Sequence, residues 1–126
     1  MKRIAALTAL ALSLSACAPA LTDATLRLSP TALQLHRGQT TSVTVWFNKY
    51  VFEGEQQEGY RLNVLDLRTR GLRTVTLQQD LRATDTALFQ VTAARNAELG
   101  RQSITVLVSD RQGRNVQQTL TVQVVE

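Results

Sequence analysis

The segment SVTVWF, residues 42–47, alternates apolar and polar side chains and decides the fold class. One face of this segment carries Val43, Val45 and Phe47, and the other carries Thr44 and Trp46. A period of two is the signature of a strand that buries one face of an antiparallel sheet. β-Branched and aromatic residues also fit a pleated surface. We therefore expect a half-buried strand at this position.

The same alternation recurs through the rest of the chain, in residues 61–67, 87–93, 103–108 and 116–124. Gln118 is the one lapse in the last of these segments. Turn-forming residues separate the runs, at Ser29-Pro30, around Gly38, before Gly100 and through 110–115. About seven short strands in roughly 100 residues predict an all-β, antiparallel sandwich of two sheets, of the immunoglobulin-like type.

Two long segments resemble bacterial immunoglobulin-like surface modules. They are SPTALQLHRGQTTSVTV, residues 29–45, and LGRQSITVLVSDRQGRNVQQTLTVQVV, residues 99–125. The resemblance implies binding, spacing or adhesion, usually without catalysis. The chain departs from the pattern by lacking a cysteine pair and by carrying Trp46 on the second strand. Modules of this kind also usually occur as parts of longer proteins.

The first residues of the chain form a targeting signal. Lys2 and Arg3 precede an apolar segment, residues 4–16. As a helix this segment would span roughly 20 Å, against roughly 30 Å for a bilayer core, which favours a signal peptide over a membrane span. Its end, Leu14-Ser15-Ala16-Cys17, resembles the lipobox of bacterial lipoprotein precursors at all four positions.

The lipobox resemblance implies that a signal peptidase recognises Leu14, Ser15 and Ala16 and cleaves before Cys17, whose thiol carries a diacylglycerol. Cleavage after Ala20 by a different peptidase is the alternative. We expect a removed signal peptide at 1–16, an acylated cysteine and tether at 17–24, and the sandwich at 25–126. Ala18 follows the cysteine where Asp would mark inner-membrane retention, so the similarity points to an outer membrane if there are two.

Composition argues against several other functions. A single cysteine excludes an internal disulfide, and a single cysteine with a single histidine argues against a zinc site. The net charge of +4 falls to +2 without Lys2 and Arg3, and the six aromatic residues are scattered, so no nucleic-acid partner is expected. His36 lies in a predicted turn with no nucleophile motif. The loop carboxylates Glu53, Glu55 and Glu58 are expected to be solvated. We therefore predict no enzyme, no metal, and no cofactor beyond the lipid on Cys17.

Two segments are candidates for binding a partner. In NKYVFEGEQQEGY, residues 48–60, the apolar Tyr50, Val51 and Phe52 either fold back to cap the core beside Trp46 or project as an anchor. In DLRTRGLRT, residues 66–74, Arg68 and Arg70 are expected to share one strand face and to form a basic stripe with Arg73. That stripe would either keep the sheet soluble or bind anionic lipids or polymers.

The sequence thus predicts an exported, lipid-anchored cell-envelope protein. Its non-catalytic module would bind another envelope protein through the 48–60 loop or through an exposed strand edge. A structural subunit or spacer of an envelope assembly is the alternative, and an enzyme is a distant one. The sequence indicates no oligomeric state.

Overall fold

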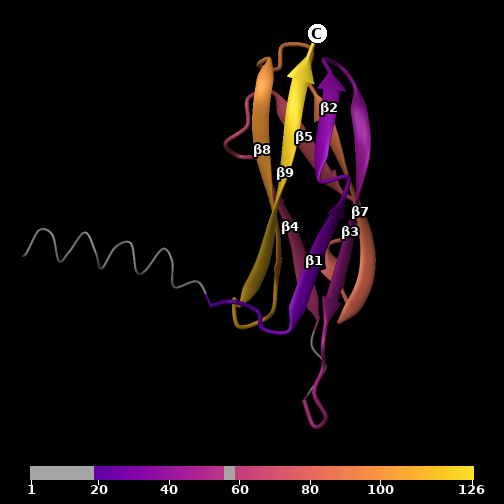
Figure 1. Ribbon diagram of the computed structural model, residues 1–126, viewed down its shortest axis with the longest axis vertical. Coiled ribbons are helices and arrows are strands. Elements are labelled where there is room, and N and C mark those ends of the chain that lie inside the picture. Colours follow the sequence, from indigo (N-terminus) through magenta and orange to yellow (C-terminus); the bar gives the residue numbers. More distant parts are fainter. Residues whose placement is uncertain (1–18, 56–58) are drawn as a thin grey trace, which may run out of the picture.

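The computed structural model describes residues 19–55 and 59–126, and these form a sandwich of two β-sheets (Figure 1). The four-stranded sheet has the order β1 (Ala24–Ser29), β3 (Thr40–Lys49), β7 (Thr84–Ala93), β5 (Leu72–Thr76). The five-stranded sheet has the order β2 (Ala32–His36), β9 (Asn115–Val125), β8 (Gly100–Ser109), β4 (Tyr60–Leu65), β6 (Asp80–Leu81). The all-β class is confirmed, with nine strands in place of about seven.

The core lies between the two sheets and is built by the predicted alternation. On β3, Val43, Val45 and Phe47 are buried, with at most 1% of each exposed. The central positions of β7, β8 and β9 repeat this pattern, and the lapse at Gln118 is an exposed side chain. A buried valine, leucine or phenylalanine contributes roughly 1.5–3 kcal/mol. Burial of one face of each strand therefore fixes the strand registers.

The first strand region divides between the two sheets at Pro30. Before it, β1 pairs antiparallel with β3, and after it, β2 pairs with β9 in parallel, with Leu35 opposite Val124. Proline has no amide hydrogen to continue a ladder, so the chain crosses to the other sheet here. Since the chain keeps its direction, β2 runs the same way as β9. The predicted antiparallel arrangement holds for the other pairs of named strands, and this pair is a parallel exception within it.

Packing begins upstream of the expected sandwich boundary at Thr25. Leu21 is 5% exposed, and its amide donates to the Asn115 carbonyl at 2.8 Å. The Asn115 amide donates to the Pro19 carbonyl at 3.0 Å. Part of the expected tether at 17–24 is therefore held against β9. The predictions for residues 1–18, including the lipobox at 14–17, and for Glu58 lie outside the described residues. Nowhere in the described ranges is there a helix able to span a membrane.

Candidate interaction surfaces

The chain after β3 forms an exposed aromatic loop, residues 50–55, which projects beyond the strand ends (Figure 1). Tyr50 is 60% exposed and Phe52 is 49% exposed, while Val51 is half-buried. The Tyr50 and Phe52 rings meet edge to face, with centroids 4.7 Å apart. Of the two sequence-based alternatives, the projecting one agrees with this geometry. The core near this end is instead packed by Tyr60, whose ring centroid lies 5.0 Å from that of Phe47.

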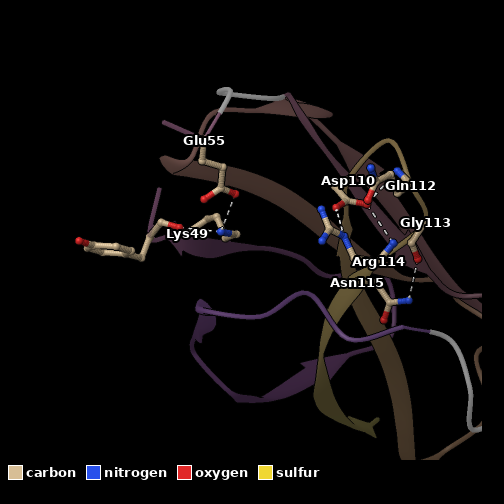
Figure 2. Close-up of polar contacts among 8 residues, drawn as sticks. Lys49, Glu55, Asp110, Gln112, Gly113, Arg114 and Asn115 are labelled. Carbon is tan, nitrogen blue, oxygen red and sulfur yellow. Dashed lines mark hydrogen bonds and ion pairs between the residues drawn. The ribbon is translucent and has the colours of Figure 1, made fainter. Parts of the chain in front are cut away.

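A buried lysine holds the aromatic loop in place. The Lys49 side chain is only 5% exposed, and its ammonium donates to the Tyr50 carbonyl at 2.6 Å. The same nitrogen pairs with Glu55 Oε1 at 3.4 Å, as Figure 2 shows, and lies 5.7 Å from the centre of the Phe52 ring. The Lys49 ammonium is therefore buried beneath the loop, while the Tyr50 and Phe52 rings remain exposed.

Glu55 closes the aromatic loop from the other side. Its Oε2 accepts the Phe52 amide at 2.9 Å, and its own amide donates to the Phe52 carbonyl at 2.9 Å. The Phe52 amide lowers the pKa of the Glu55 carboxyl, and the Lys49 ammonium lowers it further, against an opposing effect of burial. Glu55 is therefore part of the loop framework, whereas Glu53 is simply exposed.

The three candidate arginines do not form one stripe. β4 ends at Leu65, so Arg68 and Arg70 lie in the connection before β5 and the expectation of a shared strand face is wrong. Arg70 pairs with Glu98 Oε2 at 3.0 Å, and its backbone amide donates to Gln102 Oε1 at 2.7 Å. Arg73 is exposed on β5.

Gly71 immediately precedes β5 and has a backbone conformation that other residues rarely adopt. Its φ is +86°, and an added Cβ would lie 2.5 Å from the Ala97 Cα atom. Only glycine adopts this conformation readily and allows so close an approach. The backbone therefore turns at Gly71, just before β5. The strand that begins at Tyr60 has already ended at Leu65, where the Thr69 amide donates to the Asp66 carbonyl at 3.0 Å and closes a turn.

The two sets of predicted binding residues lie at opposite ends of the sandwich. The Tyr50 amide donates to the Asp23 carbonyl at 2.9 Å, beside the place where the chain enters the fold. Arg70 contacts Glu98 and Gln102, at the beginning of β8. β8 begins at the end of the sandwich where the chain finishes (Figure 1). One partner-binding surface cannot include both sets.

Sequence reasoning missed an apolar patch on the outer side of the four-stranded sheet. We call it the Trp46 face; its exposed members are Trp46, Val75, Leu77 and Leu88. Trp46 pairs with Thr86, two residues from Leu88 on β7, and the Leu77 amide donates to the Leu88 carbonyl at 3.2 Å. The Arg27 guanidinium lies 5.3 Å from the Trp46 ring centre. The alternation already placed Trp46 outward, but the joining of β5 to β7 could not be read from the sequence.

Asp110 and His36 hold a turn and a strand end. Asp110 is buried, and its side chain accepts the Gln112 and Arg114 amides at 2.9 Å and the Arg114 Nε at 2.7 Å (Figure 2). His36 ends β2, and its Nδ1 lies 2.7 Å from the Glu126 carbonyl oxygen. In residues 19–55 and 59–126 no group of three or more His, Cys, Asp or Glu side chains could hold a metal ion.

No family model and no curated protein matches this chain. Solved structures do match its fold. Domains 4 and 5 of the S-layer protein SbsC match at 16% identity and a TM-score of 0.53, over 81% of this chain and 45% of that one. The BIgI domain of beta protein from S. agalactiae, bound to CEACAM1, matches at 15% identity and a TM-score of 0.51, over 80% of this chain and 95% of that one.

A conjugative transposon lipoprotein from Bacteroides eggerthii matches at 16% identity and a TM-score of 0.52, over 80% of this chain and 97% of that one. The fold also occurs inside an enzyme, since a family 123 glycoside hydrolase from Clostridium perfringens matches at 8% identity, over 27% of its length. This chain spans less than half of the S-layer structure that it matches. At such identities the likeness shows the fold alone: the chain is a β-sandwich of the immunoglobulin-like type.

Proposed function

We propose that this protein is a lipid-anchored component of a bacterial envelope, whose immunoglobulin-like module binds another envelope protein and catalyses no reaction. Residues 1–16 direct export, and Cys17 carries the lipid anchor in the outer membrane of a double-membraned cell. The LSAC segment at 14–17 and the fold shared with a lipoprotein support this proposal.

The observation that carries the binding function is the Trp46 face. Monomeric soluble proteins rarely leave neighbouring large apolar side chains exposed without a use for them. Tryptophan and arginine dominate the energetic centres of protein interfaces, and here Arg27 lies over Trp46. Polar or charged residues surround the apolar members, among them Thr86, Gln90 and Arg73. An apolar centre with a polar rim is the composition of a protein interface.

In this proposal Arg73 belongs to the rim of the interface, because it shares the outer face of β5 with Val75. Arg68 and Arg70 lie in the preceding connection and contribute nothing to it. The structural alternative is a spacer within an envelope assembly. It draws support from β9, which begins at Asn115 beside Pro19 and ends at Val125, so that the two ends of this long strand would separate two attachments.

A photo-crosslinking residue placed at Leu88 in intact cells tests the proposal. We expect one dominant crosslinked envelope protein. The matched control carries the same residue at Thr119, which is exposed on the outer side of the five-stranded sheet. Equal crosslinking from the two positions, or none from Leu88, would contradict the Trp46 face as the binding surface.

The anchor is tested separately by Cys17→Ser. This variant should leave the membrane fraction and appear in the soluble one, and continued membrane association would contradict the lipid anchor. Stoichiometric co-purification of the unchanged protein with one large assembly would favour the spacer over a dedicated binder.

A further inference from the structure

We infer that the aromatic loop, residues 50–55, inserts Tyr50 and Phe52 into the lipid surface that holds the anchor. The protein would then contact its membrane at two points, the lipid on Cys17 and this loop. The inference rests on the proposed lipid anchor and adds to it an orientation of the whole module.

The tether between the anchor and the packed domain is very short. Pro19 follows Cys17 by two residues, and its carbonyl already accepts the Asn115 amide at 3.0 Å. Two residues of extended chain reach at most about 7 Å. Leu21, two residues further on, is buried in the core. The end of the sandwich that contains Pro19 is therefore kept against the bilayer.

The aromatic loop belongs to that same end. Tyr50 donates its amide to Asp23 at 2.9 Å, and Lys49 pairs with Ala24 in the β1–β3 ladder. Figure 1 shows the loop extending past the point where the chain enters the fold, along the long axis of the sandwich. With the anchor at this end, the loop is the part of the module that reaches furthest toward the lipid.

The loop also has the chemistry of an interfacial segment. Tyrosine combines an apolar ring with a polar hydroxyl, and aromatic residues of this kind gather at membrane–water interfaces. Tyr50 and Phe52 are outward and adjacent, with Val51 half-buried between them. Lys49 and Glu55 already fix the loop through four polar contacts, so little ordering entropy would be lost on insertion.

The charges in and around the loop indicate whether apolar insertion or electrostatic attraction would hold it at the lipid surface. Asp23, Glu53 and Glu55 lie in or beside the loop, and Lys49 is buried and already paired with Glu55. Residues 50–55 themselves contain no lysine or arginine, and Arg114, which lies close enough to lower the pKa of Glu55, is paired with Asp110 at 2.7 Å. We therefore expect the aromatic rings of the loop, and not a basic patch within it, to drive insertion. Insertion should depend on the aromatic rings and should occur equally on zwitterionic phosphatidylcholine.

Brominated lipids, which quench tryptophan fluorescence on contact, test this inference. Trp46 is the single tryptophan, so a Trp46→Phe background allows one reporter to be placed at will. The test variant is Tyr50→Trp in that background. The matched control is Leu67→Trp, since Leu67 is 90% exposed in the connection away from the anchored end. The mature lipidated protein is purified from cells and reconstituted in phosphatidylcholine vesicles with brominated acyl chains.

We expect the tryptophan of the Tyr50→Trp variant to lose roughly half of its emission and to shift to shorter wavelength, because interfacial segments lie about 5–10 Å below the lipid surface. The tryptophan of the Leu67→Trp control should keep its emission. If the two vesicle-bound variants show equal emission losses, or the test variant shows none, the inference is overturned, and a protein partner for the loop becomes the better explanation.

A second preparation separates this result from the fate of the proposed anchor. Cys17 is the only thiol, so signal-free protein can be coupled there to a maleimide lipid and bound to the same vesicles. Quenching of the Tyr50→Trp variant in this preparation supports loop insertion, whatever happens to the protein from cells. If the protein purified from cells does not float with vesicles, that result overturns the lipid anchor and leaves the insertion standing. Unquenched emission of this variant in both preparations overturns the insertion alone.

Discussion

The ammonium of Lys49 lies 3.4 Å from a carboxylate oxygen of Glu55, across the turn that follows β3. The lysine is buried and the glutamate is at the surface. This pair determines whether Tyr50 and Phe52 are presented as a fixed surface or as a loose loop. It therefore links packing at one end of the sandwich to the proposed contact with lipid.

Lys49→Met should loosen the loop while leaving the sandwich folded. Methionine keeps the apolar stem but removes the hydrogen bond to Tyr50 and the contact with Glu55. Global stability should fall by less than about 2 kcal/mol, because removing a buried charge offsets part of the lost bonding. Amide exchange by NMR should show faster exchange at Phe52 and Glu55. The Leu62 amide, bonded to Gln79, should be unchanged, and unaltered protection at Phe52 would contradict this role of Lys49.

Acid should weaken the loop through Glu55. The Phe52 amide and the Lys49 ammonium lower the pKa of this carboxyl below its ordinary value of 4.5. Since folding favours the ionised form, the stabilisation is complete above pH 4.5 and is lost as the pH falls through the lowered folded value. Glu55→Gln should abolish this part of the pH dependence in urea unfolding. Glu53→Gln alters an exposed carboxylate of the same turn and should retain it.

Gly71→Ala should be among the most destabilising single substitutions in the chain. The new methyl group would lie 2.5 Å from the Ala97 backbone, at a φ of +86°. We expect a loss of more than about 2 kcal/mol, from the clash added to the backbone strain. Gly113→Ala provides the control, because φ is +83° but nothing lies within 4 Å, and it should cost only about 1 kcal/mol. Equal losses in urea unfolding would show that the Ala97 contact does not matter.

Asp66→Ala should expose a strand edge. β5 is an outer strand of its sheet, and its Thr74 amide donates to Asp66 Oδ2 at 3.0 Å in place of a neighbouring strand. Unpaired edge amides promote association between chains. The alanine variant should lose about 1–3 kcal/mol and self-associate in sedimentation experiments. Asp66→Asn keeps an acceptor oxygen and should remain closer to the original behaviour. Aggregation of both variants alike would contradict this account.

The sequence was sufficient for the strands whose inner faces are apolar. Val43, Phe89 and Ile104 are buried as their alternation required, because a one-residue shift would expose the whole set. It was insufficient for the segment 66–71, where the Arg70 amide donates to Gln102 and Gly71 lies close against Ala97, and both of these partners are distant in the sequence. The pairing of β2 with β9 was missed for the same reason.

The same distinction between local patterns and long-range contacts applies to the candidate surfaces. The exposure of Tyr50 and Phe52 depends on where Lys49 and Glu55 meet, which the spacing alone left open between a capping and a projecting loop. The Trp46 face requires β3, β7 and β5 to be neighbours, and no local pattern encodes that order. Local alternation predicts burial, whereas the gathering of exposed side chains is a property of topology.

The parallel pairing of β2 with β9 affects how the module would resist a stretching force. A pull that separates the end that contains Pro19 from the opposite end would draw β2 and β9 past each other lengthwise. Their five paired positions, from Ala32 opposite Thr121 to His36 opposite Val125, would then resist together. A peeling force breaks such bonds one after another, whereas sliding must break them at once. The proposed lipid anchor would apply this tension where the chain enters the fold, and an attachment at the far end of β9 would complete it. The crossing at Pro30 places β2 where its pairing with β9 resists that load.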